Sequence, residues 1–399
     1  MATSIRATAQ TLLEVKHLNV DYLAADGTVH AVTDVNFTLR RGEILGLAGE
    51  SGSGKSTLAY AITRLLNPPA LITGGEILYY PGPPQEESEA SPVTWMHLPK
   101  HGERGRATNG QPRSGDEGQP EEAIDLLRLS QRQLMHIRWN DLAIVFQSAM
   151  NALNPVMTIG TQIMDVLHRH RPHMKPAACK QRAVELLNLV GIASDRLRSY
   201  PHELSGGMRQ RAIIAIALAL SPEILIMDEP TTALDVVVQR EILTQIKRLQ
   251  KRLGFSVIFI THDLSLLLEL ADHVAIMYAG RVIEKASRRD LYLHPRHPYS
   301  YGLLNSFPTL QGPRRVMAGI PGSPPDLRAV PPGCAFHPRC PFAFDACSTV
   351  LPVLQAGPEE GSQQTMACHL YDARFTATPP ATADLAAKYE ALAERSGVE

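Results

Sequence analysis

A glycine-rich segment near the start of the chain has the residue types and the spacing needed to hold phosphate groups. It fits the pattern G-x-x-x-x-G-K-[ST], and its residues are Gly49, Glu50, Ser51, Gly52, Ser53, Gly54, Lys55, Ser56 and Thr57. The glycines let successive backbone N–H groups converge on phosphate oxygens, and a helix that follows adds its positive N-terminal end. In this pattern the Lys55 ammonium reaches the β- and γ-phosphates, and the Ser56 hydroxyl ligates Mg²⁺. The sequence therefore predicts a nucleoside triphosphate site, and we call residues 49–57 the phosphate-binding loop.

Two further segments carry residues suited to phosphoryl transfer. An apolar run over 224–227 ends in Asp228 and Glu229, and His262 follows a second apolar run. A buried strand would deliver Asp228 to the metal, and Glu229 could act as the general base for an attacking water. His262 could contact the γ-phosphate. Alone, these patterns are more typical of an ordinary strand end and a structural histidine, but the upstream loop favours the catalytic interpretation.

The elements that must position these residues follow from the apolar periodicity. Apolar strands alternate with helical patterns, which indicates an α/β fold with a mostly parallel sheet covered on both faces. The expected strands are 12–22, 29–39, 44–48, 74–80, 142–147, 223–229 and 256–263, with a turn at Asp26-Gly27. The expected helical segments are 55–66, 125–138, 157–195, 207–220, 236–253, 264–271 and 380–396.

Composition excludes several classes of protein. The chain has 399 residues, with 39 Lys and Arg against 40 Asp and Glu, so its formal net charge is −1. This balance argues against a basic protein that binds nucleic acid through bulk charge and against an acidic solvating chain. The longest apolar run, 212–220, is too short for a membrane span, and the N-terminus lacks a secretory h-region. We therefore expect a cytosolic protein with reduced thiols, of two or three domains.

Two segments depart from the globular pattern. Residues 81–120 are rich in Pro, Gly, Glu, Ser and Arg, which predicts a surface insertion. After Pro308 the proline density rises and the chain becomes irregular and carries cysteines. We expect one domain over 1–305 and a second over 306–399.

A short motif between these segments identifies the family. Leu204, Ser205, Gly206, Gly207 and Met208, followed by Arg209-Gln210-Arg211, closely resemble the signature of ABC-transporter ATPases. A serine hydroxyl, glycine amides and a helix N-terminus all favour an anion. In that family the signature faces the γ-phosphate held by the phosphate-binding loop of the other subunit.

The resemblance covers about residues 12–300 and assigns further positions. It implies that Gln147 senses Mg²⁺ and water, that Ala233-Leu234-Asp235 crosses the dimer interface, and that Tyr22 stacks on adenine. A tyrosine that packs on the core is the alternative for Tyr22. The implied fold is a P-loop NTPase cassette with a mixed or parallel sheet core, an antiparallel β subdomain and a helical subdomain over 148–205.

A finer resemblance concerns the transported solute. The residues 148–155 after Gln147, the run His297-Pro298-Tyr299-Ser300, the run 320–325 and the cysteine tail resemble the D-type ATPase of oligopeptide/dipeptide importers. That family usually has an acidic residue and proline after the glutamine, where this chain has Ser148-Ala149. Nickel and oligosaccharides therefore stay alternatives to peptides.

Four of the five cysteines crowd into the tail. They are Cys334, Cys340, Cys347 and Cys368. Clustered thiols in a reducing compartment suggest a metal, and four thiolates suit either tetrahedral zinc or an iron–sulfur cluster. The resemblance favours a [4Fe–4S] cluster over zinc or free thiols. The lone Cys179 fits a small buried hydrophobe.

The resemblance also implies partners and a place in the cell. It implies a sister ABC ATPase in a heterodimer, two transmembrane permease subunits and, through them, an extracytoplasmic solute-binding protein. The chain would lie at the cytoplasmic face of the membrane as a peripheral subunit that binds ATP and Mg²⁺ but no nucleic acid. The alternatives are a soluble ABC ATPase without a transport role and a cassette retained as a scaffold or sensor.

Overall fold

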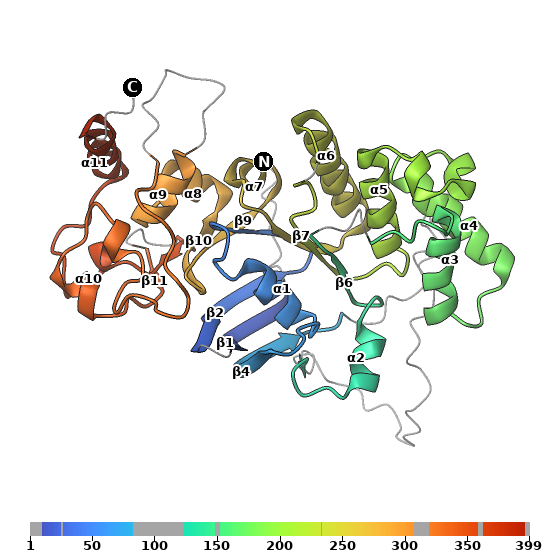
Figure 1. The fold of residues 1–399 in the computed structure, drawn as a ribbon, viewed down its shortest axis with the longest axis horizontal. Coiled ribbons are helices and arrows are strands. Elements are labelled where there is room, and N and C mark those ends of the chain that lie inside the picture. Colours follow the sequence, from blue (N-terminus) through green and yellow to red (C-terminus); the bar gives the residue numbers. More distant parts are fainter. Residues whose placement is uncertain are drawn as a thin grey trace, which may run out of the picture. The chain divides into compact units, whose positions relative to one another are not determined.

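The computed structural model describes residues 10–24, 27–82, 123–147, 152–232, 234–306, 319–357 and 362–395 (Figure 1). These residues divide between two compact units. Unit 1 comprises Met1–Glu14, Thr38–Gly42 and Glu76–Val257, and unit 2 comprises Val15–Phe37, Glu43–Gly75 and Ile258–Glu399. The expected insertion at 81–120 lies outside the described residues except for Pro81 and Gly82.

Unit 2 contains the longer run of paired strands. Its strands are β3 (Ile44–Ala48), β9 (His273–Tyr278), β10 (Arg281–Ser287), β11 (Gln355–Ala356) and β12 (Thr365–Met366). They follow the order β11-β12-β10-β9-β3. β3 pairs with β9 in parallel, whereas β9 and β10 are antiparallel. The sheet is therefore mixed, which is one of the two forms that the family resemblance implied.

The helices of unit 2 lie between and after its strands along the chain. They are α1 (Lys55–Ile62), α7 (Leu264–Leu270), α8 (Arg288–Leu293), α9 (Pro298–Leu304), α10 (Asp345–Thr349) and α11 (Thr382–Arg395), with 3₁₀ turns η4 (His337–Arg339) and η5 (His369–Tyr371). The helix expected at 380–396 is thus present as α11. It packs on α9, where Tyr389 Oη donates to the Pro298 carbonyl at 2.9 Å.

Unit 1 holds a parallel strand pair and a group of helices. Its strands are β5 (Ile124–Asp125), β6 (Leu142–Val145) and β7 (Ile224–Asp228), and β6 pairs with β7 in parallel. Its helices are α2 (Gln131–Ile137), α3 (Ile159–His170), α4 (Pro176–Leu189), α5 (Gly206–Ala217) and α6 (Val236–Leu253), with 3₁₀ turns η2 (Ser194–Arg198) and η3 (Pro201–Glu203). α3, α4 and α5 pack on one another (Figure 1).

The remaining strands run from one unit into the other along the chain. They are β1 (Thr11–Ala24), β2 (Gly27–Arg40), β4 (Ala70–Tyr79) and β8 (Ser256–Ile260). β1 lies between β2 and β4 in their sheet, and in unit 1 the end of β4 pairs antiparallel with β5.

The prediction of a helix over 125–138 is wrong for the first half of that range. Residues 124–125 form β5, and α2 starts only after Ser130, which makes a reciprocal capping box with Gln133. Such a box satisfies free N–H groups at a helix start and fixes where the helix begins. The long helical segment 157–195 is likewise divided, because α4 starts afresh with Pro176 in its first turn.

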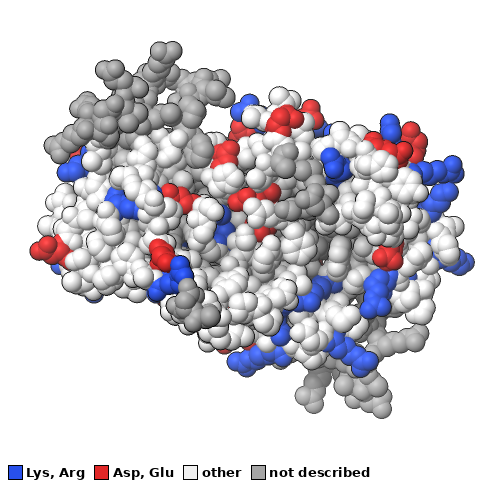
Figure 2. Space-filling model, in the orientation of Figure 1, with Lys and Arg blue, Asp and Glu red and all other residues white. Residues whose placement is uncertain are grey.

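The surface and the helices agree with the composition. Among the described helices, none is long and apolar enough to cross a membrane. On the face drawn in Figure 2, Lys and Arg side chains are interspersed with Asp and Glu among neutral residues, in keeping with the net charge of −1.

Candidate functional site

The phosphate-binding loop joins β3 to α1 within unit 2. All five residues of β3 are buried, so the strand anchors the start of the loop. Gly54 is the N-cap of α1 and has a left-handed backbone with φ 97°. The strand–loop–helix context that the motif requires is therefore present.

At two positions of this loop, close contacts with neighbouring backbone require the residue to be glycine. A Cβ on Gly54 would overlap the carbonyl oxygen of Ala31, and one on Gly49 would overlap the carbonyl oxygen of Met277. Both glycines also have positive φ. No other residue type fits these positions without displacing the backbone.

Lys55 is folded into the loop that precedes it. Its Nζ donates to the carbonyl oxygens of Gly49 and Glu50, each at 2.8 Å, and contacts Ser53 Oγ at 3.3 Å. The side chain is buried. The ammonium thus lies among main-chain oxygens of the loop, where it can exchange these partners for phosphate oxygens.

Tyr22 and His262 are the other predicted site residues of unit 2. Tyr22 Oη lies 3.3 Å from Thr57 Oγ1 in the first turn of α1, and the tyrosine is half-buried. His262 is exposed and follows Thr261, whose N–H donates to the Leu47 carbonyl just before the loop.

The predicted general base belongs to unit 1 and contacts the predicted glutamine. Gln147 Nε2 donates to Glu229 Oε2 at 3.0 Å, although the two residues are 82 positions apart. Asp228 is fully buried at the end of β7. Glu229, directly after it, has a left-handed backbone with φ 45°, which is rare for a residue with a side chain. Such conformations cluster at functional sites.

Thr232 is a site residue that the sequence reasoning missed. Its Oγ1 donates to Glu229 Oε2 at 3.0 Å, so the carboxylate accepts hydrogen bonds from both Thr232 and Gln147. A threonine three positions after Glu229 gives no distinctive signal in one sequence.

The signature residues start helix α5 in unit 1. Ser205 is the N-cap, and its Oγ accepts a hydrogen bond from the Met208 N–H at 3.3 Å. Gly206 and Gly207 form the first turn, and Gly207 lies against Val238 of α6. The first turn of α5 therefore begins with small residues, and the N-terminal end of a helix favours an anion.

Asp235 caps helix α6. Its Oδ1 accepts hydrogen bonds from the N–H groups of Val237 and Val238, at 3.1 and 3.0 Å. Ala233, the first residue of the predicted interface loop, lies outside the described residues. The structure thus gives Asp235 a helix-capping role.

The four tail cysteines are free thiols within unit 2. Burial raises the pKa of Cys334 to about 11 and that of Cys340 to about 12, and charge repulsion among the thiols adds to both shifts. Burial also raises the pKa of Cys368, and charge repulsion from the other three thiols adds to the shift. Throughout the part of the chain that the structure describes, no group of three or more His, Cys, Asp or Glu side chains is placed to hold a metal ion. The expected [4Fe–4S] or zinc site is therefore not supported by this arrangement.

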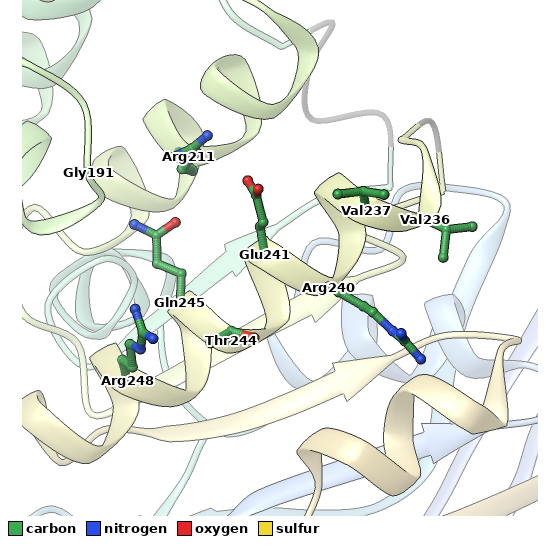
Figure 3. Close-up of a pocket in the computed structure, with 9 residues that line it drawn as sticks. All are labelled: Gly191, Arg211, Val236, Val237, Arg240, Glu241, Thr244, Gln245 and Arg248. Carbon is green, nitrogen blue, oxygen red and sulfur yellow. The ribbon is translucent and has the colours of Figure 1, made fainter. Parts of the chain in front are cut away.

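An open hollow lies between α6 and the neighbouring part of unit 1 (Figure 3). Glu241 and Gln245 point from α6 toward Gly191 and Arg211, whereas Arg240 points to the other side. The residues that line the hollow are Gly191, Arg211, Val236, Val237, Arg240, Glu241, Thr244, Gln245 and Arg248. None of these is a predicted nucleotide-binding residue.

The fold and the motifs define a P-loop ATPase of the cassette type. A model of the ABC transporter family matches residues 32–232, which include the phosphate-binding loop, the signature and Glu229. The chain belongs to this family of ATP-hydrolysing proteins. Residues 283–347 match a second model, the C-terminal region of oligopeptide/dipeptide transporters.

Curated relatives extend the likeness over most of the chain. It is 41% identical to the oligopeptide transport ATP-binding protein OppD of Salmonella typhimurium, over 90% of this chain and 94% of that protein. It is 39% identical to the dipeptide transport ATP-binding protein DppD of Bacillus subtilis, over 92% and 96% of the two chains.

Solved structures support the cassette fold. The ATP-binding cassette MJ0796, in a dimeric post-hydrolysis state with ADP and phosphate, is 25% identical with a TM-score of 0.53, and the match covers 70% of this chain and 99% of that one. CbiO1 of Clostridium perfringens, part of an ABC transporter complex, is 26% identical with a TM-score of 0.52, over 71% and 90% of the two chains.

Proposed function

We propose that this chain hydrolyses ATP to energise the import of dipeptides and oligopeptides through an ABC transporter. The observation that carries the proposal is the match of residues 283–347 to the C-terminal region of peptide transporters, on a chain that retains the Gln147–Glu229 pair. Relatives named for dipeptide and oligopeptide transport support the same solute class. The subunit would lie at the cytoplasmic face of the membrane, on two permease subunits that receive peptide from a solute-binding protein.

The proposed chemistry assigns one role to each site residue. Lys55 and the loop amides would bind the phosphates, and Ser56, Asp228 and Gln147 would hold Mg²⁺. Glu229 would take a proton from water as the water oxygen bonds to the γ-phosphorus. The bond from that phosphorus to the ADP oxygen breaks, so ADP and phosphate leave. His262 would contact the γ-phosphate and Tyr22 the adenine.

A second cassette is needed to complete each nucleotide site in this proposal. Ser205, Gly206 and Gly207 would face the nucleotide held by a sister ATPase subunit, and Asp235 would lie at the interface. Each of the two nucleotide sites would then combine the phosphate-binding loop of one subunit with the signature of the other. Because this chain retains a phosphate-binding loop, a base and a signature, it would supply every residue that either site needs from it. We propose a heterodimer with a sister cassette.

Uptake assays in the organism that encodes this chain test the proposal. Deletion of the gene should abolish uptake of labelled dipeptides and oligopeptides, and the wild-type gene should restore it while Glu229→Gln should not. Loss of nickel or oligosaccharide uptake with normal peptide uptake would overturn the peptide assignment. Unchanged uptake of all these solutes would favour a soluble ABC ATPase or a scaffold.

We further propose that the four tail thiols bind a [4Fe–4S] cluster, with zinc as the alternative. The donor chemistry supports this: all four are free thiols, and the Phe336 and Phe342 amides donate to the sulfurs of Cys334 and Cys340. Amide donors of this kind stabilise thiolates. A bound cluster would supply cross-links that order a proline-rich segment.

The cluster proposal is tested by composition rather than by activity. Anaerobically purified protein should contain about four iron and four acid-labile sulfide per chain, with visible absorbance that dithionite bleaches. Cys340→Ser and Cys368→Ser should lose both, while Cys179→Ser should not. Stoichiometric zinc without sulfide would replace the cluster by the alternative, and protein free of metal would refute both.

A further inference from the structure

Glu50 of the phosphate-binding loop contacts elements far along the chain. Its N–H donates to Tyr299 Oη at 2.9 Å, and its carbonyl oxygen accepts from Lys55 Nζ at 2.8 Å. Its carboxylate forms a two-point ion pair with Arg339, at 2.7 and 3.0 Å, across 289 positions. All four residues belong to unit 2. Both the backbone and the side chain of Glu50 are therefore held by residues outside the loop.

Arg339 uses its whole guanidinium in this contact. Nε donates to the Pro321 carbonyl at 2.7 Å, and the terminal nitrogens reach Tyr278 Oη and the Gly322 carbonyl at 3.3 Å besides both Glu50 oxygens. A guanidinium has five N–H donors, and here each can find an acceptor. The Arg339 side chain is only 6% exposed, against 26% for Glu50. The ion pair is therefore largely buried and geometrically well defined, unlike an ordinary ion pair at the surface.

An aromatic cluster fixes the direction from which Arg339 approaches. The rings of Tyr278, Tyr299 and Phe336 contact one another with centroids 4.7 to 5.4 Å apart. The Arg339 guanidinium lies 5.8 Å from the centre of the Tyr278 ring and 6.0 Å from that of Phe336. Arg339 has little freedom to move away from Glu50 while these rings remain packed.

The charge of Glu50 gives this pair a consequence for nucleotide binding. A carboxylate inside a loop that receives phosphates repels them, and the repulsion grows with phosphate charge. A paired arginine cancels that charge and fixes the carboxylate. We propose that Arg339 is a positioning residue that neutralises and holds Glu50, so that the C-terminal segment sets the affinity of the loop for nucleotide. This inference rests on the assignment of residues 49–57 as the nucleotide-binding loop.

A purely structural role of the pair predicts a different pattern of variants. If the pair only stabilises unit 2, Arg339→Gln and Glu50→Gln should weaken nucleotide binding alike. If charge neutralisation matters, the two should differ in sign, because the first leaves a lone carboxylate at the loop and the second leaves a lone guanidinium. Removing both charges should then restore affinity.

The test measures the Kd of MgATP and of ADP for the full chain by titration calorimetry, with thermal unfolding in parallel. Arg339→Gln should raise the Kd of MgATP about tenfold and that of ADP less, whereas Glu50→Gln should bind MgATP at least as tightly as the wild type. The double variant should return close to the wild-type Kd. Arg328→Gln, in a tail arginine that forms an ion pair with nearby Asp326, is the matched control and should leave both Kd values unchanged.

Two outcomes would overturn the proposal: equal weakening by both single variants without recovery in the double variant, or no effect of Arg339→Gln. Should Arg339→Gln fail to fold, Arg339→Lys keeps the charge while losing the two-point contact. It should raise the Kd of MgATP by a smaller factor than tenfold, and an unchanged Kd would also refute the proposal.

Lys55→Ala separates this inference from the proposed function. Normal MgATP binding by that variant would disprove the loop assignment itself, whatever the Arg339 variants do.

Discussion

Glu229 combines a backbone conformation that is costly with a side chain that is fixed. A left-handed residue with a Cβ costs about 1 kcal/mol or more, and here it aims a carboxylate that Gln147 and Thr232 hold from two directions. Both partners donate hydrogen bonds to the same oxygen, Oε2, so they fix the orientation of the carboxylate.

This geometry predicts a clean separation of binding from chemistry. Glu229→Gln keeps the size of the side chain and an oxygen that can accept from Thr232, but it removes the base. We expect steady ATPase activity to fall by about 10²-fold or more with the Kd of MgATP little changed. Phosphate release and nucleotide titration measure the two quantities, and Glu241→Gln on the exposed face of α6 is the control. Turnover at the wild-type rate would disprove the role of Glu229.

His297 makes folding stability depend on pH. Burial lowers its pKa to about 3 from the usual 6.5, and Nδ1 accepts the Tyr299 N–H at 3.0 Å. As pH falls below 6.5, the unfolded chain binds a proton that the folded chain does not, so stability is lost progressively until pH approaches 3.

Replacing His297 by a residue that does not titrate should remove this loss. His297→Asn can still accept the amide hydrogen bond. Between pH 6.5 and 4.5 it should lose about 2 kcal/mol less stability than the wild type, measured by urea unfolding at each pH. The buried Glu284 nearby, whose pKa burial raises, acts in the opposite direction but is common to both proteins. His202→Asn at the surface is the control. If the stability of His297→Asn fell with pH as steeply as that of the wild type, the argument would be contradicted.

Helix α5 is held at both ends by side chains. Ser205 caps its start, and the guanidinium of Arg182 donates to the carbonyls of Leu218 and Ala219 beyond its end. Arg182 is 2% exposed, and burial lowers its pKa to about 10. The orphan carbonyls of a helix end are thereby satisfied. Side chains thus hold α5 both at its start, where the signature lies, and just beyond its end.

Helix α5 also packs on α6, where Gly207 lies against Val238. A Cβ on Gly207 would lie 2.7 Å from Val238 Cγ1. Gly207→Ala should therefore lower the free energy of unfolding by about 1–3 kcal/mol, and adding Val238→Ala should recover part of that loss. Thermal unfolding measures both. Gly319→Ala, where a Cβ would meet nothing within 4 Å, is the control; a Gly207→Ala protein as stable as this control would refute the packing argument.

The elements that carry local signals could be predicted from the sequence. The strand at 44–48, the loop after it and the caps of α5 and α6 depend on residues within a few positions of one another. The apolar pattern extends before Ser130 and so predicts too early a start for α2, because the capping box at Ser130 determines where the helix begins. The pairing of Glu50 with Arg339 joins residues 289 positions apart, and no local pattern in one sequence encodes it.

At the scale of the whole molecule, unit 2 combines two early segments, Val15–Phe37 and Glu43–Gly75, with the chain from Ile258 onward. The phosphate-binding loop, β9, α9 and the cysteine segment all belong to it, and β12 of the tail pairs with β10. The expected domain boundary at 305/306 stays a prediction, because it depends on whether residues 306–399 fold and act independently. The contacts of Arg339 and Phe336 with residues before 306 argue that they do not.

Two truncations decide this question. A chain that ends at Ser306 loses Arg339, Phe336 and β12 together. Because removal of a buried aromatic alone costs about 3 kcal/mol or more, it should melt at a lower temperature and bind MgATP more weakly. A chain that ends at Ala381 loses only α11, with the buried Leu385 and Tyr389, so it should be less stable but keep its MgATP affinity. If the shorter chain bound MgATP and melted like the full chain, residues 306–399 would be an independent domain and the loop would not depend on them.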